Sequence, residues 1–185
     1  MNELLDYFKN LENIEDVDLK YTLEVMLSRS GATQAEDAAW YYQNQTKVVL
    51  QNSGIKSVEP LRYLTQVETL VLDRNSISDL SPLFELSNLS HLNLIGNDVS
   101  SLVGIEKLPQ VRELFIGFNL LKDISPLSNL RSLKMLGLKS NRISDISSLE
   151  MLTSCSQINL EGNPVDTIDV DSLIGKLPGC KIMFS

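Results

Sequence analysis

Five asparagines recur in this chain at a constant interval of 22 residues, and this regularity constrains the fold more than any other feature. They are Asn75, Asn97, Asn119, Asn141 and Asn163. Each one follows two aliphatic residues at alternate positions, so the whole string repeats and not the asparagine alone. Self-similarity at a period of this length indicates stacked structural units that cover one another.

A sixth, degenerate copy precedes these five, with Leu50 in phase and Ser53 in the place of the asparagine. The predicted coils of 22 residues are 45–66, 67–88, 89–110, 111–132, 133–154 and 155 to about 176. The coils can be aligned with one another, and each aligned position forms a column of equivalent residues. The columns then sort the residues of each coil into buried and exposed positions.

Two aliphatic columns stand two residues apart, so both point to the same face of a short strand. Two further columns bring the return half of each coil onto the same core, because a single coil cannot bury them alone. The strand columns are Val48, Leu70, Leu92, Leu114, Leu136, Ile158 and Leu50, Leu72, Leu94, Ile116, Leu138, Leu160. The return columns are Ile55, Ile77, Val99, Leu121, Ile143, Val165 and Val58, Leu80, Leu102, Ile124, Ile146, Ile168.

The asparagine column has a structural explanation. A tight coil that turns after a parallel strand leaves buried backbone groups, and an inward amide supplies two donors and an acceptor for them. Four residues later stands a column of small polar residues of the kind that cap a helical turn. With a proline three positions further on in three coils, we expect short turns of 3₁₀ type on the convex side. The capping column is Ser57, Asp79, Ser101, Asp123, Asp145 and Thr167, and the prolines are Pro60, Pro82 and Pro126.

The string L-x-x-L-x-x-L-x-L-x-x-N-x-I-x-D-I-x-P-L occurs with small departures at Leu127 to Leu149 and at Leu108 to Leu130. It resembles the 22-residue leucine-rich repeat of the bacterial internalins and of the leucine-rich regulatory subunit of type-one protein phosphatases. The resemblance covers residues 45 to about 170. It implies an α/β solenoid, a curved right-handed stack of six coils with a concave parallel sheet and convex 3₁₀ turns. The repeat encodes the scaffold and leaves the function open.

We expect a cap at each end of the one continuous domain. Residues 1–44 carry no repeat and predict a helical cap, in which Asp16 or Asp18 begins a helix that Gly31 ends. Thr33 and Glu36 resemble a capping box for a third helix. Residues 177–185 predict the end of a closing helix and a short strand at 181–184. Because this cap covers the core, we expect the chain to end with it.

The N-terminal cap carries most of the negative charge. Residues 1–44 hold nine acidic and three basic side chains, and the chain as a whole has a net charge of −8. This balance disfavours nucleic acid as a partner. The acidic cap is interpreted either as a docking surface for a basic protein or as a solvated helical end.

No stretch approaches the length of a membrane span, and the first residues lack the basic and apolar regions of a secretory signal. We therefore expect a chain that is cytoplasmic, or secreted as an effector without a classical signal peptide. We also expect a monomer, although unpaired terminal strands can pair between chains where a cap is imperfect.

Several chemical functions are disfavoured. One histidine and two separated cysteines cannot build a closed zinc site, and no glycine-rich phosphate loop is present, so no cofactor or metal is expected. Cys155 falls in a core column, and we expect both Cys155 and Cys180 to be free thiols. The single histidine, His91, is predicted beside Thr69, Glu113 and Asp73. No serine or cysteine nucleophile accompanies it, so the chain is not expected to be an enzyme.

Function is predicted on the concave face, where strand residues alternate with the buried leucines. Val71, Ile95, Phe115 and Met135 are apolar residues of this face. Phe118 lies one step beyond its strand, beside Gly117 and Gly137. An aromatic pair of Phe115 and Phe118 next to a shallow depression is typical of a protein interface, although scattered surface residues, or Phe118 folding over the coil edge, would look alike. The candidate partner-binding residues are Val71, Asp73, Arg74, His91, Asn93, Ile95, Glu113, Phe115, Phe118, Met135 and Lys139.

The sequence therefore predicts a protein-binding scaffold that recognises one protein partner through its concave face. It would act as an adaptor, as a regulatory subunit, or as an effector or immunity-type inhibitor. The alternatives are an internalin-like surface or secreted adhesin and, much less favoured, an enzyme.

Overall fold

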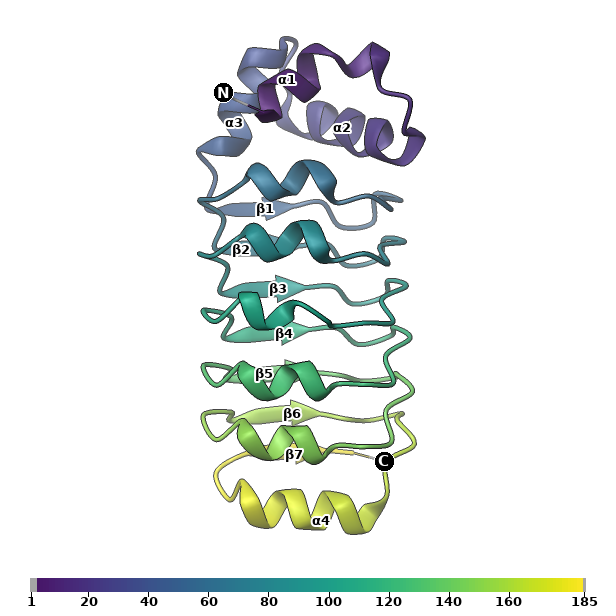
Figure 1. Ribbon diagram of the computed structural model, residues 1–185, viewed down its shortest axis with the longest axis vertical. Coiled ribbons are helices and arrows are strands. Elements are labelled where there is room, and N and C mark those ends of the chain that lie inside the picture. Colours follow the sequence, from purple (N-terminus) through teal and green to yellow (C-terminus); the bar gives the residue numbers. More distant parts are fainter. Residues whose placement is uncertain (1–2, 185) are drawn as a thin grey trace.

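The computed structural model describes residues 3–184, so that positions 1, 2 and 185 of the two predicted caps lie outside the described residues. The chain winds into an elongated stack of short coils with the N-terminal helices at one end and a single helix at the other (Figure 1). Each coil contributes one strand to a sheet on one side and one helical turn to the opposite side.

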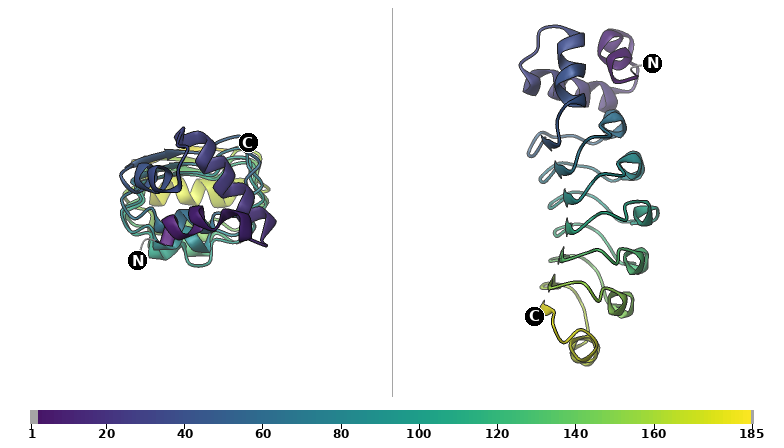
Figure 2. Two further views of the ribbon diagram at one scale, coloured as in Figure 1. Left: turned by 90° about the horizontal axis from the view of Figure 1, so that it is seen from above. Right: turned by 90° about the vertical axis from the view of Figure 1, so that its left-hand side faces the viewer.

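The sheet has seven parallel strands in sequence order, and neighbouring coils pair at the 22-residue step, as in Val48 opposite Leu70. The side view in Figure 2 shows that the sheet curves and lines the concave side. Six strands come from the predicted coils and the seventh comes from the closing segment, which confirms the predicted solenoid. The strands are β1 (Lys47–Val49), β2 (Thr69–Val71), β3 (His91–Asn93), β4 (Glu113–Phe115), β5 (Met135–Gly137), β6 (Gln157–Asn159) and β7 (Lys181–Met183).

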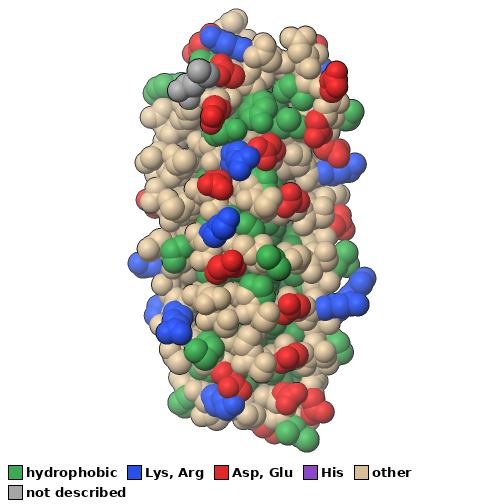
Figure 3. All heavy atoms as spheres, viewed as in Figure 1, with side chains coloured by type: hydrophobic (Ala, Val, Ile, Leu, Met, Phe, Trp, Pro, Cys, Tyr) green, Lys and Arg blue, Asp and Glu red, His purple; other side chains and the backbone are tan. Residues whose placement is uncertain are grey.

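Short 3₁₀ helices form the convex side, as the prolines and the capping column predict. The Asp123 carboxylate accepts the Ser125 N–H at 2.8 Å, and Asp79 and Asp145 make the same turn in their coils. On this face apolar side chains are scattered between charged and polar ones (Figure 3). The helices are η2 (Glu59–Tyr63), η3 (Ser81–Glu85), η4 (Ile105–Lys107), η5 (Ser125–Asn129) and η6 (Ser147–Met151).

The asparagine ladder joins each coil to the one before it. The Asn119 Oδ1 accepts the Val99 N–H at 2.9 Å, while its Nδ2 donates to the carbonyls of Leu94 at 2.9 Å and Ile116 at 3.1 Å. Asn75, Asn97, Asn141 and Asn163 repeat this pattern. In the first coil the Ser53 hydroxyl donates to the Gln51 carbonyl at 3.0 Å and accepts from the Arg29 guanidinium of the N-terminal cap at 3.1 Å. The ladder is therefore structural, as predicted.

The sixth coil departs from the repeat. Helix α4 (Thr167–Lys176) replaces the 3₁₀ turn and buries Val170 and Leu173. Ile168, which the periodicity assigns to the core, is 75% exposed, because the longer helix rotates a different face inward. The predicted cap at Thr167 is also wrong by one residue, since the Asp166 carboxylate accepts the Ile168 N–H at 2.8 Å.

The N-terminal cap consists of α1 (Glu3–Lys9), the 3₁₀ turn η1 (Leu11–Asn13), α2 (Val17–Ser30) and α3 (Ala35–Gln43). Asp16 caps α2, and Gly31 ends it with a φ of 70°, as predicted. The capping box is wrong: Gln34 precedes α3 and makes no side-chain cap, and Glu36 instead pairs with Lys9 at 2.9 Å. An ion pair across two helices here replaces the local bond that the sequence indicated.

The cap is bonded to the first coil through α2. The Thr22 hydroxyl donates to the Ser57 carbonyl at 2.8 Å, and the Tyr21 hydroxyl donates to the Ser53 carbonyl at 2.9 Å. Leu4, Leu23 and Met26 are fully buried in a core that continues into the repeats. Within residues 3–184, no helix has the length and apolar character to cross a membrane.

Candidate functional site

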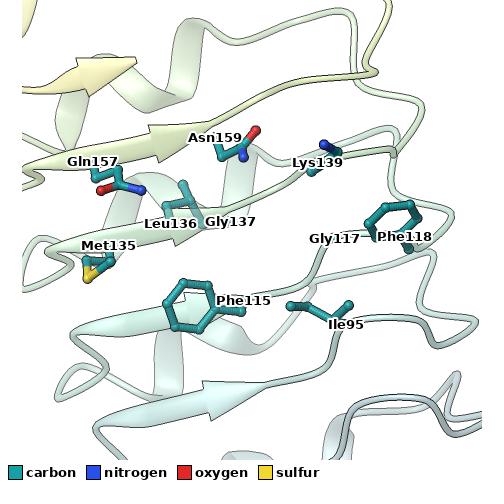
Figure 4. A pocket seen from close by; sticks show the side chains of 10 residues that line it. All are labelled: Ile95, Phe115, Gly117, Phe118, Met135, Leu136, Gly137, Lys139, Gln157 and Asn159. Atoms are coloured by element: carbon teal, nitrogen blue, oxygen red, sulfur yellow. The ribbon is translucent and has the colours of Figure 1, made fainter. Parts of the chain in front are cut away.

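The concave sheet contains a small depression, here named the concave recess, with a cavity volume of about 180 Å³. It opens over β4, β5 and β6 and over residues that follow β3, β4 and β5 (Figure 4). In this view Phe118 lies at one end of the recess and Met135 and Gln157 lie at the other, with Phe115 and Ile95 along one edge between them. The lining residues are Ile95, Phe115, Gly117, Phe118, Met135, Leu136, Gly137, Lys139, Gln157 and Asn159.

Two glycines leave the space in which the recess forms. Gly137 lies directly opposite Phe115 in the sheet, and a Cβ at Gly137 would come within 3.0 Å of the Phe115 ring. A Cβ at Gly117 would come within 2.9 Å of the Lys139 carbonyl oxygen. Any larger residue at either position would therefore displace the ring or the neighbouring backbone and change the shape of the recess.

Phe118 adopts a backbone conformation that a bulky residue normally avoids. Its φ is 55°, and its side chain is 55% exposed. The same column holds positive φ values in every coil, and glycine fills it in two of them without strain. A non-glycine residue in this left-handed region costs about 1 kcal/mol or more. Because a large aromatic ring stands more than half exposed in a position that favours glycine, the residue is a candidate for function. The equivalent positions are Asn52, Arg74, Gly96, Ser140 and Gly162.

The recess gathers five of the eleven predicted partner-binding residues, namely Ile95, Phe115, Phe118, Met135 and Lys139. The other six lie outside its lining: Val71, Asp73, Arg74, His91, Asn93 and Glu113. Gln157 and Asn159 line the recess but were not selected from the sequence. The 22-residue register could have identified them, because they pair with Met135 and Gly137 on the neighbouring strand.

A polar cluster surrounds the single histidine beside the recess. The His91 Nε2 lies 3.2 Å from a Glu113 carboxylate oxygen, and its Nδ1 lies 2.7 Å from the Ser90 Oγ. The Ser90 hydroxyl has a second acceptor in the Glu68 carbonyl at 3.1 Å, and the tautomer of the imidazole decides which of the two acceptors receives its hydrogen. Asp73 is not part of this cluster, contrary to the prediction, and accepts from Asn93 at 3.4 Å.

An ion pair between Lys139 and Glu161 borders the recess. The Lys139 ammonium lies 2.7 Å from the Glu161 carboxylate, and this hydrogen bond lowers the pKa of Glu161. Each group largely neutralises the other, which leaves the apolar side chains as the dominant chemistry of the recess. In the described part of the chain, no three His, Cys, Asp or Glu side chains gather as a metal site.

A family model for paired leucine-rich repeats matches residues 87–129. An internalin from Listeria monocytogenes is 30% identical, with a TM-score of 0.58 over 78% of this chain and 52% of the internalin, so the chain spans about half the length of that protein. A second Listeria internalin is 22% identical, with a TM-score of 0.56 over 88% and 91%. A leucine-rich repeat protein of Leptospira interrogans is 23% identical, with a TM-score of 0.73 over 80% and 39%. The comparison with curated proteins gave no match.

These similarities agree with the geometry. The matched repeat model covers the coil 89–110 and most of the coil 111–132, and its residues include β3 and β4, which carry part of the recess. The 30% identity to the first internalin extends the likeness beyond the fold and suggests a bacterial origin, whereas the two weaker identities support the fold alone.

Proposed function

Because the chain is a leucine-rich repeat protein whose repeats resemble those of the internalins, we propose that it is a protein-binding scaffold that recognises one protein partner through its concave face. Proteins of this repeat class are known for protein–protein interaction, and their curved stacks present extended concave binding surfaces. The concave recess is the proposed centre of the contact, with Phe115 and Phe118 as its anchors.

The observation that carries this proposal is an exposed, strained aromatic residue beside an apolar recess. The cavity of about 180 Å³ is smaller than the roughly 300–1,000 Å³ that is usual for small-molecule sites. A single side chain of a protein partner suits this space better than a free ligand. Burying an aromatic anchor at the centre of such an interface is worth about 2 kcal/mol or more.

The remaining concave residues supply the border of the proposed contact. The His91–Glu113 and Lys139–Glu161 pairs already hold one another in place, so they present fixed polar groups at a small entropic cost. Val71, Arg74 and the Asp73–Asn93 pair extend the surface toward the N-terminal cap. We assign these groups to orientation of the partner and the recess to affinity.

The proposed role is that of an adaptor, a regulatory subunit, or an effector or immunity-type inhibitor that covers a partner's site. The chain would act as a non-enzymatic monomer, either in the cytoplasm or after secretion by a route that needs no classical signal peptide. An internalin-like adhesin is the second candidate, favoured by the 30% identity to a Listeria internalin. Localisation of the protein separates these two, because an adhesin must be found at the cell surface, whereas an adaptor stays in the cytoplasm and a secreted effector is found in the medium or in the partner's cell.

A comparative pull-down from the lysate of the source organism tests the proposal. The baits are the wild type, a recess variant (Phe115→Glu with Phe118→Glu) and a matched control (Val103→Glu with Met151→Glu). The control makes the same chemical change at two exposed apolar residues of the convex side, 75% and 46% exposed. We expect the wild type and the control to retain the same protein and the recess variant to lose it.

Retention of that protein by the recess variant would contradict the proposed site. A further bait, Glu15→Lys with Glu24→Lys, examines the acidic cap. If only this bait loses the partner, the contact lies on the N-terminal cap, and the concave proposal is wrong. Circular dichroism of all four baits checks that each is folded.

A further inference from the structure

The two cysteines meet at the C-terminal end of the stack, although the sequence separates them by a whole coil. Cys155 precedes β6 and Cys180 immediately precedes β7. Gln157 pairs with Lys181, and the Lys181 N–H donates to the Ser156 carbonyl at 2.8 Å. Cys180 therefore lies opposite Ser156, the residue that follows Cys155. With the usual strand spacing and rise, the Cα atoms of the two cysteines lie about 6 Å apart, within the range for disulfides.

Each thiol affects the pKa of the other, so the two groups are neighbours in space as well as in the register of the strands. The Cys155 thiol is buried, with 5% of its residue surface exposed, and also lies 3.3 Å from the carbonyls of Lys134 and Gln157. Cys180 is only partly buried. The Cys180 thiol is therefore accessible to an oxidant, whereas the Cys155 thiol lies in the core.

We propose that Cys155 and Cys180 form a reversible disulfide that fastens the C-terminal cap to the sixth coil, with a small oxidised thiol such as glutathione disulfide as the oxidant. The Cys180 thiolate attacks one sulfur of glutathione disulfide, and a glutathione thiolate leaves. Cys155 loses its proton to water and attacks the Cys180 sulfur, which releases the second glutathione. The two cysteines lose two electrons and two protons, and the glutathione disulfide is reduced to two thiols.

The location of the pair gives the bond a mechanical effect. The disulfide would close a loop that contains β6 and α4 and that ends immediately before β7. In the reduced protein β7 is a three-residue edge strand. Because β6 also carries Gln157 and Asn159 of the concave recess, fastening β7 to β6 stiffens that border of the recess.

The burial of Cys155 also slows the formation of the disulfide. Desolvation raises the pKa of the Cys155 thiol to about 11, and burial raises the pKa of Cys180 as well. Thiolate is the attacking form, so both steps are slow near neutral pH and accelerate as the pH rises. Brief exposure to an oxidant leaves the pair reduced, whereas prolonged residence in an oxidising compartment closes it.

The test incubates the full-length protein in glutathione buffers of increasing oxidised fraction, followed by acid quenching, intact-mass spectrometry and thermal unfolding. We expect a monomer that has lost two hydrogens and carries no glutathione. Its melting temperature should rise on the order of 5–10 °C, because the cross-link restricts the unfolded chain. Cys180→Ser, which keeps the buried cysteine, should show neither the mass loss nor the rise.

Three outcomes would overturn the proposal. They are a stable glutathione adduct on Cys180 without ring closure, a disulfide-linked dimer in place of the monomeric product, and an oxidised monomer that melts no higher than the reduced one. Peptide mapping of the oxidised protein must also find Cys155 and Cys180 in a single linked fragment. A failure of this test leaves the proposed concave interface unaffected, because the pull-down uses neither cysteine.

Discussion

Replacing Phe118 tests whether this residue is held against its backbone preference. Both Phe118→Gly and Phe118→Ala remove the ring, but only glycine also relieves the strain of a φ of 55°. The ring is 55% exposed, so its loss removes less than half of the burial energy of a phenylalanine, about 1 kcal/mol. Relief of the left-handed strain returns about 1 kcal/mol. We expect Phe118→Gly to be as stable as the wild type and Phe118→Ala to be about 1 kcal/mol less stable.

Urea unfolding followed by circular dichroism measures this difference. The matched control is Phe115, which lies in β4 with extended backbone, where glycine is the poorer replacement by about 0.5–1 kcal/mol. The order of alanine and glycine should therefore reverse between the two phenylalanines. If Phe118→Gly is less stable than Phe118→Ala, the strain argument is wrong. If Phe118→Gly is stable and still retains the partner, the Phe118 ring is not an anchor of the contact.

Three further changes have defined outcomes. Asn119→Ala leaves buried backbone groups of Leu94, Val99 and Ile116 without partners and should lower the free energy of unfolding by about 3 kcal/mol, measured by urea titration, whereas Asn119→Ser should lose less. Gly137→Ala should displace the Phe115 ring and weaken partner capture in the pull-down while the circular dichroism spectrum stays unchanged. Asp123→Ala should melt below the wild type at neutral pH. The bond to Ser125 lowers the pKa of Asp123, so its contribution is present above the ordinary value of 3.8 and disappears as the pH falls through the lower folded value; the two melting temperatures should then converge.

The periodic part of the chain is where sequence reasoning succeeded. A 22-residue step fixes the register of β1 to β6, so their buried columns and concave residues follow from counting. The same register brings Phe115, Met135 and Lys139 onto neighbouring strands. The register also places Gln157 and Asn159 beside these residues. They line the recess, but they were not predicted because the prediction favoured apolar and charged residues.

The failures fall where the period breaks. Ile168 and Thr167 were assigned by extending the repeat into the sixth coil, but α4 has a different spacing and rotates them out of their columns. The meeting of Cys155 and Cys180 was hidden for the same reason, because the longer helix shifts β7 out of phase with the 22-residue step. Thr33 and Glu36 fit a local motif, and a contact with Lys9 from another helix prevailed over it.

Photocrosslinking from position 118 tests the central claim most directly. A benzoylphenylalanine at 118 keeps the aromatic ring and reacts only with what touches it, and the same probe at Val103 on the convex side is the control. We predict that irradiation in lysate links the protein retained in the pull-down to position 118 and not to position 103. A link to that protein from position 103 alone would show that the partner binds elsewhere.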